Sequence, residues 1–384
     1  MKNPSSNIHL PTSNSPKIAI VVDWITDMGG TTRTDLALHE AFPDAPIYTS
    51  VYEPDDLARR HLSGLDIRTT WLQKLPKPLR KLQRLFPMLR VKAFRDLDLS
   101  EFDIIISSSS AESKQVRKTR PGQVHICYCH TPIRYYWSHY KEYKKDPGLG
   151  KLNWAAKLAM PVLVPPLKRA DYRAAQAVDV FIANSTEVQK RIMKYYGRHS
   201  TVIHPPVDVD RFTHVSKSAA QRTYYLAHGR QVPYKRVDLA VKACSELGLP
   251  LIVSGNGPEH ENLKKMAGPT VKFRPGQSDE QVAKLFGGAK AYIFPAEEDF
   301  GIVQAEALAA GTPVIAFAGG GSQDIIRDGE GGITFEHQTV DSVKDAIGEL
   351  EKRPFKPANL QRIAKRFHKT LFISKMRKIV GDQS

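Results

Sequence analysis

Two glutamates are the residues most suited to chemistry in this sequence, and both lie in residues 294–317 (FPAEEDFGIVQAEALAAGTPVIAF). Gly301 permits a tight turn, and residues 302–310 have the pattern of a short helix. The first turn of such a helix offers free N–H groups and the positive end of the helix dipole, which suit a phosphate. Glu298, an exposed loop acid at the mouth of a cleft, would accept hydrogen bonds from sugar hydroxyls, and Glu306 from a ribose diol. Two solvated acids at a helix start would give the same spacing.

Short apolar strands, separated by helical stretches or glycine-rich loops, must position these residues. The first half of the chain has them at residues 17–23, 47–51, 102–107, 124–129, 178–183 and 201–204. The second half has them at residues 224–227, 251–254, 271–273, 291–294 and 314–317. Strands that alternate with helices in this way are typical of a doubly wound parallel sheet. The sequence therefore predicts an α/β protein with two Rossmann-like domains.

The consecutive prolines of HPPVD, residues 204–208, separate the two halves, because neither a helix nor a central strand continues through them. We expect a first domain at residues 17–206, after a disordered lead-in at residues 1–16, and a second domain at residues 207–358. Residues 359–384 are expected to form a C-terminal helix that packs back on the body of the protein. Its apolar positions at helical spacing are Leu360, Ile363, Ala364, Phe367, Leu371 and Phe372.

The composition is that of an ordinary globular protein. The 384 residues are 41% hydrophobic and 25% charged, and the longest apolar stretch, residues 158–167, is shorter than the roughly 20 residues of a membrane span. Three cysteines are too few for a disulfide framework and favour a reducing cytoplasm. Cys127 and Cys129 lack the usual zinc spacing, so no metal site is expected. The net charge of +16 favours polyanionic partners without distinguishing nucleic acid, anionic lipid and phosphorylated substrates.

The pair Glu298 and Glu306, with a Phe-Gly step between them, resembles the signature of the family 4 retaining glycosyltransferases, which have the GT-B fold. The likeness covers most of the chain, residues 17–372. It implies two Rossmann-like domains that face each other across a cleft holding the active site. It also implies that Glu298 contacts the donor sugar and Glu306 the nucleotide ribose. The neighbouring residues implied to bind the donor are Phe300, Gly301 and Ile302.

A second match follows the first strand of the second half. Arg230 and Lys235, in GRQVPYKRVD, resemble the family's Arg and Lys pair that grips the donor diphosphate. Negative charge develops on the departing diphosphate, and cations already in place stabilise it, so no metal and no cofactor beside the nucleotide-sugar donor are expected. The loops implied to lie near the nucleotide contain Ser254, Gly255, Gly257 and Arg274. A plain turn would explain these glycines equally well.

Two segments of the first half complete the resemblance. Gly29 and Gly30 match the family's glycine loop facing the donor phosphates and the acceptor, although a simple strand-to-helix turn would look the same. His130 follows a strand at the carboxyl edge of a parallel sheet, where ligands bind, and the family has a His there that contacts the donor sugar. CHTPIRY at 129–135 and VPYKR at 232–236 resemble the mannosyltransferases that use GDP-mannose. A UDP-sugar donor remains an alternative, because base contacts in this family often use backbone atoms.

The chain departs from the family pattern at Gln323 and Asp324, where relatives usually carry a Glu after the glycines, and no contact is transferred to these two residues. The sequence does not indicate which carboxylate, if any, would act as the nucleophile of a double displacement. The family is thought to react on one face of the sugar, where the leaving phosphate takes the acceptor proton. Two other functions stay open: a sugar-nucleotide epimerase of the same architecture and a nucleic-acid-binding protein, although no nucleic-acid module is visible.

Residues 74–95 combine basic and apolar side chains without an acid. The basic ones are Lys74, Lys77, Arg80, Lys81, Arg84, Arg90, Lys92 and Arg95, and the apolar ones include Leu79, Leu82, Leu85, Phe86 and Leu89. This mixture suits the headgroup layer of a membrane, although a solvated basic helix shows the same pattern. We expect a lipid-linked saccharide acceptor, an anionic membrane surface as partner, no nucleic acid, and a cytoplasmic, peripheral location on the inner face of the cell membrane.

Overall fold

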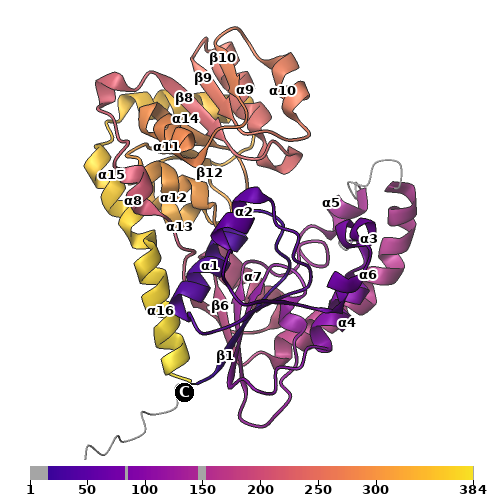
Figure 1. The fold of residues 1–384 in the computed structure, drawn as a ribbon. Coiled ribbons are helices and arrows are strands. Elements are labelled where there is room, and N and C mark those ends of the chain that lie inside the picture. Colours follow the sequence, from indigo (N-terminus) through magenta and orange to yellow (C-terminus); the bar gives the residue numbers. More distant parts are fainter. Residues whose placement is uncertain (1–15, 83–84, 146–152, 384) are drawn as a thin grey trace, which may run out of the picture.

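The computed structural model describes residues 16–82, 85–145 and 153–383, and it shows two α/β domains, one above the other in Figure 1. A parallel sheet in the order β3-β2-β1-β4-β5-β6-β7 forms the centre of the first domain, and one in the order β10-β9-β8-β11-β12-β13 forms that of the second. The strand order reverses between β1 and β4 and again between β8 and β11. Open α/β sheets bind ligands at such switch points. The expected pair of Rossmann-like domains is confirmed.

The first domain follows the predicted alternation of strands and helices. Its strands are β1 (Ile18–Val22), β2 (Ile47–Thr49), β3 (Ile67–Thr69), β4 (Ile104–Ser109), β5 (Val124–Cys129), β6 (Val180–Ala183) and β7 (Thr201–Val202). Its helices are α1 (Gly30–Ala41), α2 (Asp56–His61), α3 (Lys77–Lys81), α4 (Pro87–Arg95), α5 (Tyr140–Lys145), α6 (Asn153–Ala177) and α7 (Thr186–Tyr196). Strand β3 escaped prediction because this three-residue edge strand, Ile67-Arg68-Thr69, has no apolar run.

The second domain repeats the pattern. Its strands are β8 (Tyr224–His228), β9 (Leu251–Ser254), β10 (Val271–Arg274), β11 (Ala289–Phe294), β12 (Val314–Phe317) and β13 (Gly332–Phe335). Its helices are α8 (Val209–Thr213), α9 (Val237–Glu246), α10 (His260–Met266), α11 (Asp279–Gly288), α12 (Ile302–Ala309), α13 (Ser322–Ile325), α14 (Val340–Lys352) and α15 (Pro357–Ala364). Strand β13 was not predicted. It starts at Gly332, where a Cβ would lie 1.8 Å from the Val314 carbonyl oxygen of β12.

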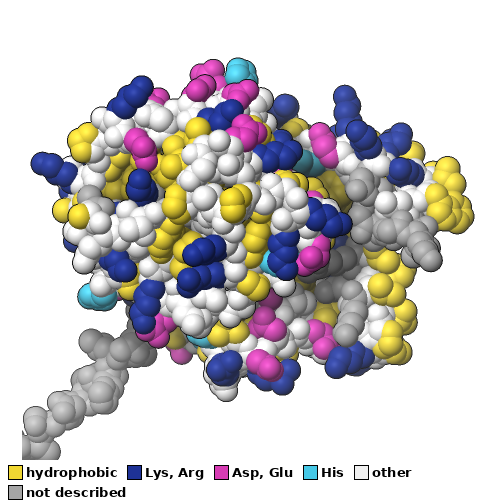
Figure 2. Space-filling view, turned by 90° about the horizontal axis from the view of Figure 1, so that it is seen from above, with side chains coloured by type: hydrophobic (Ala, Val, Ile, Leu, Met, Phe, Trp, Pro, Cys, Tyr) yellow, Lys and Arg dark blue, Asp and Glu magenta, His cyan; other side chains and the backbone are white. Residues whose placement is uncertain are grey.

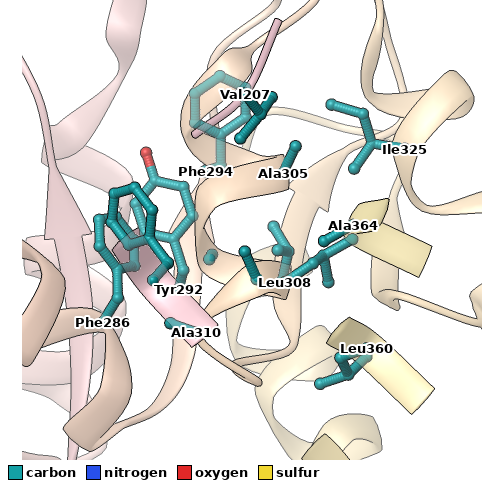
Figure 3. Packing of buried hydrophobic residues seen from close by; sticks show 14 of the residues in the cluster. Val207, Phe286, Tyr292, Phe294, Ala305, Leu308, Ala310, Ile325, Leu360 and Ala364 are labelled. Atoms are coloured by element: carbon teal, nitrogen blue, oxygen red, sulfur yellow. The ribbon is translucent and has the colours of Figure 1, made fainter. Parts of the chain in front are cut away.

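Helix α12, which carries Glu306, is held in place by the core of the second domain (Figure 3). Leu308 of α12 belongs to the same buried cluster as Phe286 of α11, Tyr292 of β11 and Leu360 of α15, and each of these side chains is at most 1% exposed. Removing a buried Leu side chain costs about 2 to 5 kcal/mol. The helix that presents the second glutamate is therefore a rigid element rather than a surface turn.

The C-terminal segment forms two helices instead of the single helix expected. After α15 the chain turns at residues 365–368, and α16 (Lys369–Gly381) runs beside α1 of the first domain (Figure 1). The His368 side chain accepts a hydrogen bond from the Thr370 amide at the start of α16. Because of the turn, Phe372 is buried as expected, whereas Leu371 is 44% exposed, so its assignment to the buried face was wrong. The segment thus joins the two domains.

Candidate active site

Two helix N-termini meet between the domains. Helix α1 begins at Gly30 directly after Gly29, and a Cβ on Gly30 would lie 3.0 Å from Cδ1 of Ile302, the first residue of α12. Gly301 precedes α12 with φ +85, a left-handed conformation that favours glycine. Free N–H groups and the positive dipole ends of both helices therefore point to one region, as an anionic ligand requires.

Glu298 is paired with Lys235 at this place. Its Oε1 lies 2.9 Å from the Lys235 Nζ, and the two side chains are only 18% and 15% exposed. Burial alone would lower the pKa of the Lys235 ammonium, but the charge of Glu298 and its hydrogen bond raise the pKa above its ordinary value. The expectation of an exposed loop acid was wrong. Residues 295–301, which connect β11 and α12 within the second domain, bring Glu298 to the cation.

Glu306 lies one helical turn after Ile302 and lines a cavity of about 940 Å³ between the domains. Burial raises the pKa of Glu306, and Arg211, whose Nη2 lies 3.5 Å from the carboxylate, opposes that shift. Arg211 also binds Asp279 at 2.7 Å, and Asp279 binds Arg33 of the first domain at 2.9 Å. The cavity can therefore offer both carboxylates and guanidinium groups to a polar ligand that spans the two domains.

The predicted diphosphate and nucleotide residues are only partly brought together. Arg230 is exposed, and its positive charge opposes part of the rise in the pKa of the neighbouring Lys235 ammonium. Arg274, at the end of β10, is exposed and lies outside the lining of the 940 Å³ cavity. The cavity instead includes Gln277 and Ser278 from the loop that follows.

Gly255 and Gly257 are required by packing between two loops. A Cβ on Gly255 would lie 2.2 Å from the Gly229 carbonyl oxygen, and one on Gly257 would lie 2.3 Å from that of Gln231. These glycines let the loop after β9 close on the loop after β8. Their contact with a nucleotide stays a prediction.

Ser254 and His228 are neighbours in the register of β9 and β8. Ser254 is buried, and neither its Oγ nor the buried Nδ1 of His228 has a hydrogen-bond partner among the described residues. Ser254 was predicted to bind the donor, whereas His228 was not singled out, although it follows a predicted strand as His130 does.

His130 lies at the end of β5, at the carboxyl edge of the first sheet. Its Nε2 is 2.8 Å from the Ser108 hydroxyl, which donates to Asp35 at 2.5 Å. Burial lowers the pKa of His130 to about 4, and the charge of Asp299 in the second domain opposes this shift. The imidazole is therefore neutral near pH 7. Sequence reasoning found His130 but gave no sign of Asp35 or Ser108.

Asp299, next to Glu298, fastens the glutamate loop to the first domain. Its carboxylate accepts hydrogen bonds from Arg134 at 2.6 Å and from Arg191 at 2.5 Å, and its carbonyl oxygen accepts one from Ser185. These side chains come from the loop after β5, from α7 and from its N-cap. The position of Glu298 is thus coupled to the first domain through its neighbour.

Asp324 has a similar role at the position where the chain departs from the family pattern. It accepts hydrogen bonds from the Thr186 amide at 2.7 Å and from the Thr186 hydroxyl at 2.6 Å. An acid at the start of α7 also complements the helix dipole. Gln323 is exposed, and its amide donates to the Ala318 carbonyl oxygen.

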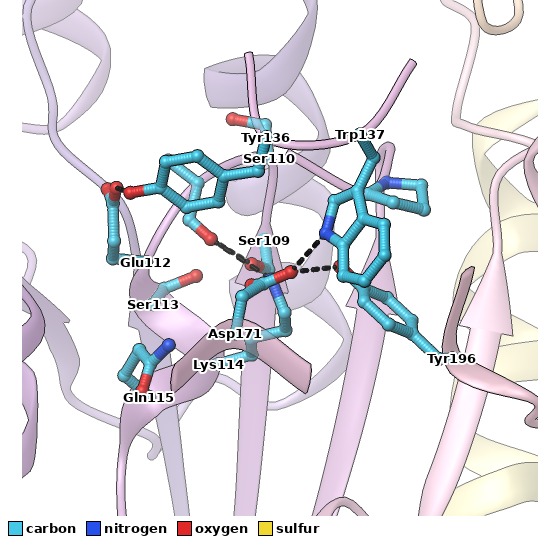
Figure 4. Close-up of polar contacts among 12 residues, drawn as sticks. Ser109, Ser110, Glu112, Ser113, Lys114, Gln115, Tyr136, Trp137, Asp171 and Tyr196 are labelled. Carbon is cyan, nitrogen blue, oxygen red and sulfur yellow. Dashed lines mark hydrogen bonds and ion pairs between the residues drawn. The ribbon is translucent and has the colours of Figure 1, made fainter. Parts of the chain in front are cut away.

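A buried polar network supports the loop after β5 that follows His130 (Figure 4). Lys114 and Asp171, both fully buried, form an ion pair of 2.5 Å, and Asp171 also accepts hydrogen bonds from Trp137 and Tyr196 at 2.7 Å each. The Asp171 carboxylate keeps the pKa of the Lys114 ammonium raised although burial alone would lower it. The network joins α6 and α7 to the strand ends that carry His130.

Within residues 16–82, 85–145 and 153–383, no group of three or more His, Cys, Asp or Glu side chains is arranged to hold a metal ion. Cys127 and Cys129 are free thiols buried on β5. Metal-independent action stays a prediction that chelation can test.

Two family models together match the chain almost from end to end. Residues 28–211 match the model described as Glycosyltransferase Family 4, and residues 208–367 match the one described as Glycosyl transferases group 1. The chain carries the two domains of the family 4 glycosyltransferases. The boundary between the two matches coincides with the passage from the first sheet to the second.

Curated relatives of this family 4 chain include two D-inositol 3-phosphate glycosyltransferases. The protein of Streptomyces scabiei is 31% identical over 217 residues, which are 48% of this chain and 49% of the relative. That of Mycolicibacterium smegmatis is 31% identical over 223 residues, 52% and 51% of the two chains. The chain thus spans about half the length of the curated relatives it matches.

Solved structures resemble the whole chain. Anabaena HepE in complex with UDP and glucose has a TM-score of 0.68 and 16% identity, and the match covers 96% of this chain and 100% of that one. Sucrose-phosphate synthase from Thermosynechococcus elongatus has a TM-score of 0.67 and 15% identity, with 94% and 98% covered. At this identity the likeness concerns the fold alone, and it confirms the expected GT-B architecture.

Proposed function

We propose that the protein is a retaining glycosyltransferase that moves a sugar, mannose from GDP-mannose in our first choice, to a lipid-linked or oligosaccharide acceptor in cell-surface polysaccharide synthesis. The observation that carries the proposal is the pairing of Glu298 with Lys235 beside the facing N-termini of α1 and α12. Carboxylate, cation and two helix dipoles match the hydroxyls and the diphosphate of one nucleotide sugar.

The proposed roles follow from these contacts. Glu298 accepts hydrogen bonds from the donor sugar, and Glu306 accepts them from the ribose at the cavity. Lys235 and Arg230 stabilise the charge that develops on the leaving diphosphate, together with the two helix N-termini. The neutral His130 supports the sugar near the reacting carbon. The acceptor hydroxyl attacks from the face of the leaving group, whose phosphate oxygen takes the proton, and the protein contributes orientation.

The donor is tested by a binding screen. The resemblance of VPYKR and CHTPIRY to the GDP-mannose subgroup favours GDP-mannose, whereas the complexes of HepE with UDP-glucose and with UDP favour a UDP-sugar. Calorimetry with GDP-mannose, UDP-glucose, UDP-galactose and UDP-N-acetylglucosamine should show tight binding of GDP-mannose only. Tight binding of one UDP-sugar alone would show that the donor is that UDP-sugar and not GDP-mannose. Conversion of a bound nucleotide sugar into its epimer without an acceptor would show that the protein is an epimerase and not a transferase.

We propose that the acceptor is lipid-linked and that the first domain docks on an anionic membrane. No described helix is long and apolar enough to cross a membrane. Many of the exposed large apolar side chains belong to α3, α4 and α6 and to the residues between α3 and α4. These helices form one lobe of the first domain (Figure 1), and Figure 2 shows hydrophobic side chains in yellow along one edge of the molecule. In α6, Trp154, Leu158 and Val162 are 67%, 70% and 71% exposed at a spacing of four residues, so they share one helix face.

The basic residues predicted for this surface are only partly available. Arg90 is buried in an ion pair with Glu112 and was wrongly placed on the surface. Arg80 pairs with Glu53 at 2.6 Å. Lys74 and Lys77 are exposed, whereas Arg84 lies outside the described residues. The exposed lysines and the apolar face of α6 suit an anionic headgroup layer, to which each nearby lysine contributes about 1 kcal/mol.

Liposome flotation tests this docking. The full chain should float with vesicles of phosphatidylglycerol and phosphatidylcholine, less so as salt rises, and Lys74→Glu with Lys77→Glu should weaken flotation. Lys264→Glu with Lys265→Glu on α10, a pair of exposed lysines in the second domain, is the matched control and should float like the wild type. Equal flotation with neutral vesicles, or none with either, would refute membrane docking without affecting the transferase proposal.

A further inference from the structure

Three side chains form a continuous hydrogen-bonded chain from α1 through β4 to the end of β5. Nε2 of His130 lies 2.8 Å from the Oγ of Ser108, and the same hydroxyl lies 2.5 Å from Oδ1 of Asp35. Asp35 is 2% exposed, Ser108 0% and His130 9%. Within the described part of the chain no hydrogen bond reaches the other ring nitrogen, Nδ1. Only Nδ1 is therefore left for a ligand.

The proton count of this chain links Asp35 to the tautomer of His130, because the Ser108 hydroxyl has a single proton. When Asp35 is ionised, Ser108 donates to the carboxylate, His130 donates its Nε2–H to Ser108, and Nδ1 can only accept. When Asp35 is protonated, it donates to Ser108, Ser108 donates to Nε2, and Nδ1 carries the ring proton. The state of Asp35 thus decides whether His130 offers a donor or an acceptor at Nδ1.

We propose that Asp35 and Ser108 are positioning residues that set the tautomer of His130, so that near neutral pH its Nδ1 donates a hydrogen bond to an oxygen of the donor sugar. The sugar as recipient rests on the proposed function. The hydrogen-bonded chain of Asp35, Ser108 and His130, called the relay below, rests on the geometry of the three side chains, which is independent of the ligand.

The surroundings of Asp35 keep it protonated near pH 7. Burial raises the pKa of its carboxyl to about 8, the Ser108 hydrogen bond opposes the shift, and the charge of Asp23 adds to it. The hydroxyl of Tyr128 stays protonated, since burial raises its pKa further. The other titratable groups on α1 are Arg33, His39 and Glu40. Helix α16, which packs on α1, carries Lys369, Lys375, Arg377 and Lys378, while Asp23 follows β1, and Glu112 and Lys114 follow β4. Of these cations, Arg33 pairs with Asp279, Lys114 with Asp171 and Lys369 with Glu40, and Arg377 donates to the Ala41 carbonyl oxygen.

Histidine tautomers can be read directly by NMR of the full-length protein labelled with ¹⁵N-histidine, with the His130 signals assigned by their loss in His130→Gln. Two-bond ¹H–¹⁵N spectra from pH 6 to 10 should show the ring proton of His130 on Nδ1 at low pH and on Nε2 at high pH, with a midpoint near the pKa of Asp35. Asp35→Asn and Ser108→Ala should each hold one tautomer over the whole range.

His125 provides an internal control in the same spectra. Its Nε2 lies 2.8 Å from the Ser107 hydroxyl, on the same strands β4 and β5, and that hydroxyl also contacts the Cys127 thiol instead of a carboxyl group. Because this pair does not involve Asp35, the response of the His125 tautomer to pH should be the same in the wild type and in Asp35→Asn. A constant tautomer of His130 in the wild type, or an unchanged switch in Asp35→Asn, would overturn the proposal.

Kinetics separate the relay from the proposed function. Between pH 7 and pH 9 the protonated fraction of a group with a pKa of about 8 falls from about 0.9 to about 0.1, so kcat should fall about tenfold in the wild type and stay level in Asp35→Asn. If the tautomer of His130 switches with pH but the protein transfers no sugar, the proposed function is refuted and the relay stands. If sugar is transferred without a tautomer switch, or if kcat falls at alkaline pH in Asp35→Asn as well, the relay is refuted and the proposed function stands.

Discussion

Replacing Glu298 by Ala should reduce both stability and transfer, because the glutamate is the ionic partner of a mostly buried lysine. The pair is 2.9 Å long, and removing the carboxylate leaves the Lys235 ammonium, 15% exposed, without its counter-charge. Losing a hydrogen bond to a charged group costs about 1.5 to 3 kcal/mol. For a domain of about 160 residues, 2 kcal/mol corresponds to a fall in Tm of about 4 to 8 °C. The loss of a contact with the donor sugar should lower kcat/KM about 100- to 1000-fold.

The assay combines thermal unfolding with donor turnover for a set of matched variants. Glu297→Ala is the control, since Glu297 is 49% exposed and reaches Arg191 only at 3.4 Å, and its Tm should stay within about 2 °C of the wild type. Glu298→Ala with Lys235→Met should regain part of the lost stability because no unpaired ammonium remains. An unchanged Tm in Glu298→Ala would refute the ion pair, and near-normal turnover would refute the site assignment.

Three further predictions concern charge. Transfer should survive excess EDTA because Arg230 and Lys235 supply the cations, and complete, reversible loss of activity would contradict this. Lys114→Met should lower the free energy of unfolding by about 3 to 5 kcal/mol by leaving Asp171 buried and unpaired, whereas an unchanged denaturant midpoint would show the pair to be dispensable. Folding raises the pKa of Asp35, so the wild type loses stability as pH rises from about 4 to 8. Relative to the wild type, the free energy of unfolding of Asp35→Asn should therefore increase by up to about 1.4 kcal/mol per pH unit in that window. A difference in unfolding free energy that does not depend on pH would contradict the assignment.

The fold could be predicted from the sequence because its signals are local. From β1 to α1, and again from β11 to α12, an apolar strand, a glycine turn and a helix start follow one another within about twenty residues. Such a pattern can be recognised without knowing which distant residues pack against it. The strands missed, β3 and β13, lack that local signal. The break between α15 and α16 was missed for a related reason, since periodicity does not reveal that one helix packs on α12 and the next on α1.

The candidate site was predictable only where its residues share a motif. Glu298 and Glu306 lie on one loop and one helix, so their spacing carried the inference. The partners that give them their properties lie far away in sequence, as Lys235 does for Glu298 and Arg211 for Glu306. The Asp35 to Ser108 contact spans 73 positions, and periodicity places both residues merely on buried faces. Such contacts depend on tertiary distances that no local pattern encodes.

The most direct test of the account is the transfer of radiolabelled sugar from a nucleotide sugar to a lipid extract by the purified protein. We predict that label from one donor, GDP-mannose before the UDP-sugars, enters the lipid fraction with its anomeric configuration retained, and that Glu298→Ala and Lys235→Met lose this transfer while remaining folded. No transfer from any nucleotide sugar, an inverted linkage, or undiminished transfer by both variants would contradict the proposed function and its site.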